Sequence, residues 1–108
     1  MSVKAFAAKL FAKRIHAKTQ KWVNNPIETQ QKVFQKLIKE ATQTQFGKDH
    51  DFNSIKNPSD FAQKVPVRDY EGLKHYVDKV VQGEENVLWP GKPLYFAKTS
   101  GTTSGAKY

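Results

Sequence analysis

The sequence predicts an α/β protein that is helical up to about residue 83 and then passes into a strand and a glycine-rich loop. Apolar residues recur at helical spacing in three long stretches before residue 83. After residue 83, short apolar and aromatic runs flank a Pro-Gly-Lys-Pro turn, and a stretch rich in hydroxyl groups and glycine follows. We therefore expect an α/β fold that is mostly helical, with its strand and loop at the C-terminal end.

The first predicted element is a basic helix over residues 3–23, within a segment that we assign to residues 1–25. This stretch holds six of the 18 Lys and Arg residues and no acid, and past it basic and acidic residues nearly balance at 12 against 10. The basicity therefore belongs to one end of the chain, and we expect no nucleic-acid partner. We expect the larger apolar residues of this helix to pack against the protein: Phe6, Leu10, Phe11 and Trp22.

A helical region is predicted over residues 26–83, and its longest helix covers 26–45. Asn25 and Pro26 are typical of a helix start, and Glu28 falls where a capping-box acid reaches back. Gly47 is expected to end this helix by taking a positive φ.

The rest of the helical region is predicted as a loop and two further helices. Residues 47–57 have the composition of a loop, and within it we expect Asp49, His50 and Asp51 to be solvated. Asn57 and Pro58 predict the start of a short helix that runs to about residue 64. From about residue 69 the apolar spacing predicts a third helix, which ends near residue 83.

The last segment, residues 84–108, carries a predicted strand at 94–98 and then the residues that point to chemistry. Residues 99–107 place five hydroxyl side chains, two glycines and a closing lysine directly after an apolar run. Small residues let backbone N–H groups approach a phosphate, hydroxyl groups add donors, and Lys107 adds a cation. The spacing matches neither a Walker A loop nor a dinucleotide-binding Gly-x-Gly-x-x-Gly.

This loop resembles the phosphate-loop signature of the adenylate-forming superfamily, all nine positions of which are satisfied by residues 99–107. Upstream segments are similar to the auxin-responsive acyl-acid amido synthetase (Gretchen Hagen) family in its bacterial form. Those segments are Thr44-Gln45-Phe46-Gly47-Lys48, Asp60-Phe61, Val65-Pro66-Val67, Asp69-Tyr70-Glu71, Leu73 and Gly83-Glu84. The resemblance covers about residues 26–108 and implies an N-terminal fragment of the large adenylate-forming domain, without the rest of that domain or a C-terminal domain.

The resemblance implies an ATP- and Mg²⁺-dependent enzyme that adenylates a small-molecule carboxylic acid and passes the acyl group to an amine such as an amino acid. It implies that the loop binds the ATP phosphates, with Lys107 as an electrostatic support. The implied phosphate-binding residues are Thr99, Ser100, Gly101, Thr102, Thr103, Ser104, Gly105 and Lys107. The catalytic residues are unknown, because the resemblance implies that the acyl and amine pockets lie beyond this chain. We expect residues 1–108 alone to be inactive and only partly folded.

Several other sites and locations are not favoured by the sequence. There are no cysteines, and His16, His50 and His75 are too scattered for a metal site, so we expect none. No apolar run approaches the ~20 residues that span a bilayer, and no secretory signal is recognisable, so a cytoplasmic location is expected. Two alternatives remain open: a small basic helical module that binds a protein or nucleic acid, and an amphipathic domain that lies on a membrane surface.

Overall fold

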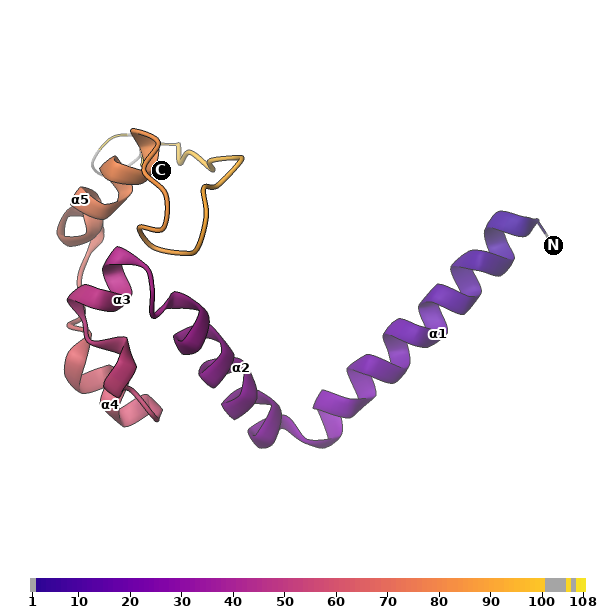
Figure 1. Ribbon diagram of the computed structural model, residues 1–108. Coiled ribbons are helices and arrows are strands. Elements are labelled where there is room, and N and C mark those ends of the chain that lie inside the picture. The colour runs from indigo at the N-terminus through magenta and orange to yellow at the C-terminus, as the bar shows by residue number, and fades with distance from the viewer. Residues whose placement is uncertain (1, 101–104, 106) are drawn as a thin grey trace. The chain divides into compact units, whose positions relative to one another are not determined.

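The computed structural model describes residues 2–100, 105, 107 and 108, and it is mostly helical (Figure 1). This confirms the helical part of the predicted fold class. The elements in chain order are α1 (Val3–Asn24), α2 (Pro26–Ala41), α3 (Gln45–Asp49), the 3-10 helix η1 (Phe52–Ser54), α4 (Pro58–Lys64) and α5 (Tyr70–Val81). None of the helices in the described residues is long and apolar enough to cross a membrane.

The chain divides into two compact units, residues 1–33 and 34–108. In the first unit, α1 begins at the N-cap Ser2, whose hydroxyl accepts a hydrogen bond from the Ala5 N–H at 3.2 Å. No residue of α1 is buried in this structure, and the expected packing of its large apolar residues stays a prediction. Asn25 donates its side-chain amide to the Lys21 carbonyl at 3.2 Å, which closes the end of α1. Glu28 pairs with Lys32 at 2.9 Å instead of reaching back as in a capping box.

The second unit holds the hydrophobic core, which the C-terminal half of α2 builds with residues that follow it. Ile38 and Ala41 of α2 are buried together with Phe52 and Ile55. Aromatic rings extend this core, because Phe46 packs edge-on against Phe52 with 5.9 Å between ring centroids. The helical periodicity of α2 therefore predicts its buried face only in part, since Leu37 on the same helix is 48% exposed.

The chain turns sharply after α2, and here the prediction is wrong in two respects. The helix ends at Ala41 and a new helix, α3, begins after Thr44 instead of a loop. Thr44 is fully buried; its hydroxyl donates to the Ala41 carbonyl at 2.6 Å and accepts the Gly47 N–H at 3.0 Å. Gly47 lies inside α3 and is buried. A Cβ on it would stand 2.1 Å from the Ala41 carbonyl oxygen, so this position has no room for a side chain. This glycine therefore provides close approach rather than a positive φ.

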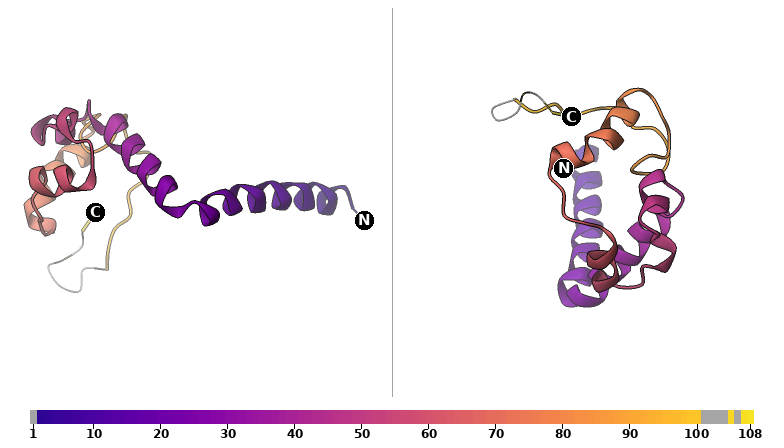
Figure 2. Two further views of the ribbon diagram at one scale, coloured as in Figure 1. Left: turned by 90° about the horizontal axis from the view of Figure 1, so that it is seen from below. Right: turned by 90° about the vertical axis from the view of Figure 1, so that its left-hand side faces the viewer.

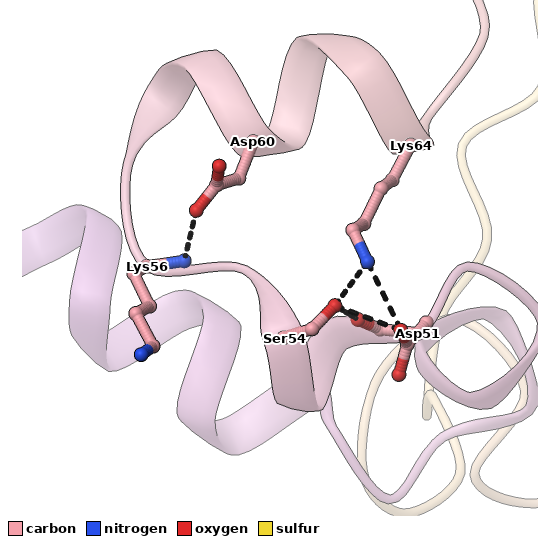
Figure 3. Close-up of polar contacts among 5 residues, drawn as sticks. All are labelled: Asp51, Ser54, Lys56, Asp60 and Lys64. Atoms are coloured by element: carbon pink, nitrogen blue, oxygen red, sulfur yellow. Dashed lines mark hydrogen bonds and ion pairs between the residues drawn. The ribbon is translucent and has the colours of Figure 1, made fainter.

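A polar cluster of Asp51, Ser54 and Lys64 fixes the segment between α3 and the end of α4 (Figure 3). The Ser54 hydroxyl donates to Asp51 Oδ2 at 2.8 Å, and Lys64 Nζ donates to the same carboxylate oxygen at 3.0 Å and to the Ser54 hydroxyl. The Ser54 hydroxyl, with Lys64, holds the pKa of the Asp51 carboxyl below its usual range. Asp51 also adopts a left-handed φ of 52°, which Asp tolerates better than most residues.

The starts of α4 and α5 are predicted correctly, because both carry side-chain caps. The Asn57 side chain accepts the Asp60 N–H at 2.8 Å, and the Asp69 carboxylate accepts the Gly72 N–H at 2.9 Å. The Asp60 carboxylate in turn accepts the Lys56 N–H at 3.0 Å (Figure 3).

After α5 the chain returns to α3 without forming regular structure. The Gln45 and Phe46 N–H groups donate to the carbonyls of Asn86 and Val87 at 2.8 and 2.9 Å, which satisfies the first turn of α3. From there the chain follows a coil in every view (Figures 1 and 2). Residues 94–98, predicted as a strand, form none in the structure. A strand needs a neighbour for its backbone groups, and no other strand occurs in the described residues.

Candidate functional site

The predicted phosphate loop is closed at its base by two hydrogen bonds. The Thr99 N–H donates to the Lys107 carbonyl at 2.8 Å. In return, the Lys107 N–H donates to the Thr99 hydroxyl at 2.9 Å. The first and last residues of the loop signature therefore meet. Because both bonds use the backbone of Lys107, they also fix the point from which its side chain extends.

Four of the eight predicted phosphate-binding residues fall in the described part of the chain: Thr99, Ser100, Gly105 and Lys107. Gly101, Thr102, Thr103 and Ser104 lie outside it. Ser100 and Gly105 are exposed. Gly105 has a φ of 83°, and nothing lies within 4 Å of the place where a Cβ would stand. A positive φ at this position is a conformation that glycine adopts freely and that lets successive N–H groups turn toward an anion.

The Lys107 ammonium lies against an aromatic ring from another element. Its Nζ stands 5.5 Å from the ring centroid of Tyr70, the first residue of α5. Within the described residues, no carboxylate lies within ion-pair distance of Lys107. A cation that no protein acid neutralises is what a phosphate site needs, so this part of the loop fits an ATP phosphate.

The residue after the loop packs back on the segment that precedes it. The Tyr108 ring stands edge-on to Phe96 with 5.9 Å between centroids, and Lys98 Nζ lies 5.5 Å from the Tyr108 centroid. Both rings line a largely apolar groove of about 400 Å³ with Val77 and Val80 of α5. The two ends of the loop are thus held by a hydrogen-bonded base and by these aromatic contacts.

A second polar cluster joins α3 to α5, and the sequence did not predict it. The Tyr76 hydroxyl donates to Asp49 Oδ2 at 2.7 Å. His50 is buried, and its Nδ1 donates to the Phe46 carbonyl at 2.7 Å. The expectation that His50 is merely solvated is therefore wrong, whereas Asp49 is exposed as expected and also accepts the Tyr76 hydroxyl. Burial, followed by the hydrogen bond to Asp49, raises the pKa of Tyr76 to about 12.

Near this cluster, Arg68 carries a buried Nη1 with no hydrogen-bond partner among the described residues. Its aliphatic stem covers Gly72, where an added Cβ would meet the Arg68 Cβ at 3.1 Å. In the described part of the chain, no three His, Cys, Asp or Glu residues gather where they could hold a metal ion. Among the described residues, the predicted phosphate loop therefore combines two features that suit a phosphate. These are the lysine cation of Lys107 and the glycine Gly105, which has open space around it.

Comparison with known proteins identifies relatives of this chain. The sequence profile described as "GH3 family N-terminal domain" matches residues 15–108. Indole-3-acetic acid-amido synthetase GH3.4 of Arabidopsis thaliana is 30% identical over 84 residues, which are 77% of this chain and 14% of that protein. Indole-3-acetic acid-amido synthetase GH3.2 of the same plant is 27% identical over 82% of this chain and 16% of its own length. The chain thus spans about a seventh of these relatives, and no solved structure matches it significantly.

Proposed function

Because the chain belongs to the GH3 family, we propose that it is the N-terminal part of an ATP-dependent acyl-acid amido synthetase. The enzyme adenylates a carboxylic acid and passes the acyl group to an amine such as an amino acid. The observation that carries the proposal is the closed base of the loop at Thr99 and Lys107, with the lysine side chain free of any described carboxylate. The two relatives described above, named as amido synthetases, support the same class of reaction.

In this proposal the loop residues hold the phosphates of Mg·ATP. The chemistry supplied by ATP is a leaving group, pyrophosphate, which departs when the acid's carboxylate attacks the α-phosphorus. The hydroxyls of Ser100, Thr102, Thr103 and Ser104 and the backbone N–H groups of Gly101 and Gly105 donate to the phosphate oxygens. Lys107 places a positive charge where negative charge develops on the departing group. Fixed donors of this kind stabilise the transition state because they need no rearrangement during the reaction.

The proposal includes a strand at residues 94–98 in the complete domain. Leu94 and Tyr95 are 86% and 89% exposed, so this segment offers apolar side chains and backbone groups to a neighbour. Pairing with a strand from elsewhere in the protein would bury both and would lead the chain directly into the phosphate loop.

The acid and the amine are proposed only as classes. The names of the plant relatives specify indole-3-acetic acid, but the matched region is about a seventh of their length. We therefore assign the chain a carboxylic acid of unspecified structure. A cytoplasmic location, where ATP and amino acids are both abundant, completes the proposal.

The test uses the complete protein with Lys107→Ala and Thr102→Ala, and Lys39→Ala, at an exposed lysine of α2, serves as a matched control away from the loop. We expect the KM for ATP to rise about ten-fold or more for Lys107→Ala, because a charge-assisted contact to phosphate is lost. Thr102→Ala is expected to weaken ATP turnover, and Lys39→Ala to leave it unchanged. If neither loop variant changes the kinetics of acid-dependent pyrophosphate release, these residues do not form the phosphate site.

A further inference from the structure

The side chain of Lys107 is long and flexible, yet the structure gives it a defined place. Its backbone is fixed at Thr99 through hydrogen bonds of 2.8 and 2.9 Å. Its ammonium group then reaches the ring of Tyr70, 5.5 Å from the centroid, which is within the range of a cation–π interaction. Lys107 itself is half-buried.

The position of the Tyr70 ring is itself fixed by the start of α5. Tyr70 is the first residue of that helix, directly after the N-cap Asp69, which accepts the Gly72 N–H at 2.9 Å. The ring is half-buried. The ring is therefore part of a capped helix end and not of a freely moving loop.

An aromatic ring suits a phosphate-binding lysine better than a carboxylate would. The ring attracts the ammonium group through its quadrupole and leaves the positive charge unneutralised. A carboxylate would attract it more strongly but would then compete with the phosphate for the same charge. Asp69 and Glu71 flank Tyr70 in the sequence, and neither forms an ion pair with Lys107 in the described structure.

We propose that Tyr70 is a positioning residue for Lys107, whose ammonium group it holds ready to bind an ATP phosphate. The inference rests on the proposed function and adds a residue that lies 37 positions away from the loop lysine. Ordering the lysine before ATP binds lowers the conformational entropy that is lost on binding. The expected consequence is tighter binding of ATP with little change in the chemical step.

The test compares Tyr70→Leu, which removes the ring, with Tyr70→Phe, which keeps it, in the complete protein. We expect Tyr70→Leu to raise the KM for ATP about two- to five-fold with kcat nearly unchanged, and Tyr70→Phe to behave like the wild type. Thermal unfolding of both variants and of the wild type shows whether either substitution destabilises the fold. If Tyr70→Leu does not fold, Tyr70→Met replaces it, since a flexible apolar side chain fills a similar space.

A second comparison separates positioning from a general structural role. In a Lys107→Ala background, Tyr70→Leu is expected to raise the KM for ATP no further, because the two residues act as a unit. The proposal is overturned if the two effects multiply, if Tyr70→Phe is impaired as much as Tyr70→Leu, or if Tyr70→Leu leaves KM unchanged. A failure of the proposed function looks different: the wild-type protein would then show no acid-dependent pyrophosphate release at all.

Discussion

Gly47 illustrates how a single residue determines the path of the chain between α2 and α3. Its N–H donates to the buried Thr44 hydroxyl, and its α-carbon faces the carbonyl oxygen of Ala41 with no room for a side chain. The clash would be with backbone atoms, which cannot rotate away as a side chain can. The presence of glycine here is thus a packing requirement.

Gly47→Ala is expected to destabilise the chain by about 3 kcal/mol or more, because the added methyl group forces the α2–α3 turn apart. Urea unfolding followed by circular dichroism measures this. Gly72→Ala is the matched control, since its Cβ would lie 3.1 Å from the nearest atom, Arg68 Cβ, instead of 2.1 Å from a backbone oxygen, and alanine favours a helix. Equal stability of Gly47→Ala and the wild type would show that the turn is not this tight.

Tyr76 makes stability depend on alkaline pH. Its ordinary pKa is about 10 in an unfolded chain. Burial and the hydrogen bond to Asp49 raise the pKa to about 12 in the folded chain. The neutral phenol is therefore favoured by folding, so its contribution is fully present below pH ~10 and is lost as pH rises through ~12.

We expect denaturation midpoints of the wild-type chain to fall over this alkaline range more steeply than those of Tyr76→Phe. The phenylalanine variant keeps the ring packing but has no group to titrate there, and the other tyrosines are common to both proteins. Parallel pH profiles for the two proteins would contradict the assignment of the raised pKa to Tyr76.

Neither Tyr76 with Asp49 nor Tyr70 with Lys107 could be paired from the sequence. Their separations of 27 and 37 residues depend on how α3, α5 and the terminal loop come together in space. The phosphate-binding role of Lys107 rests on the loop pattern, which is local, and it stays a prediction. The sequence did not predict the ring against which the lysine lies.

At the scale of elements, the sequence predicts helices where capping residues and apolar periodicity agree. Both signals are present for α4 and α5, and their starts at Pro58 and Tyr70 are correct. The prediction failed at residues 42–50, where a glycine was interpreted as a helix stop. Thr44 ends α2 and caps α3 at once, and short helices such as α3 have too few residues to show a period.

The Asp51 cluster predicts an effect at acid pH in the connection between α3 and α4. The Ser54 hydroxyl and the Lys64 ammonium favour the charged carboxylate, whose pKa is therefore lower than in the unfolded chain. The stabilisation is present above the ordinary carboxyl pKa of ~3.9 and is lost as pH falls through the lower folded value.

Asp51→Asn is expected to unfold at a lower urea concentration than the wild type at neutral pH, with the difference vanishing in strong acid. Asparagine tolerates the left-handed φ of this position, so the substitution removes the charge without adding backbone strain. Lys64→Met should reproduce the same pH dependence. A difference that persists unchanged in strong acid would show that the carboxylate charge is not responsible.

For the molecule as a whole, exposed large apolar residues occur along α1 and again in the segment that leads to the predicted phosphate loop. Leu94, Tyr95, Trp89 and Phe96 are all at least 45% exposed in the segment that leads to the phosphate loop. Apolar groups collected in this way are typical of a surface that another part of a protein covers. The strand that the sequence predicts at 94–98 does not form in the structure. A strand pairs its backbone groups with a second strand, and no second strand occurs in the described residues.

The most direct test of the account is pyrophosphate release from Mg·ATP by the complete protein, with a panel of carboxylic acids and with residues 1–108 alone in parallel. The account predicts release that depends on the acid for the complete protein, increased when an amino acid accepts the acyl group, and no release by residues 1–108. Absence of both release and ATP binding in the complete protein would contradict the account. The phosphate-loop assignment would then fail, and a basic helical binding module would become the leading explanation of the chain.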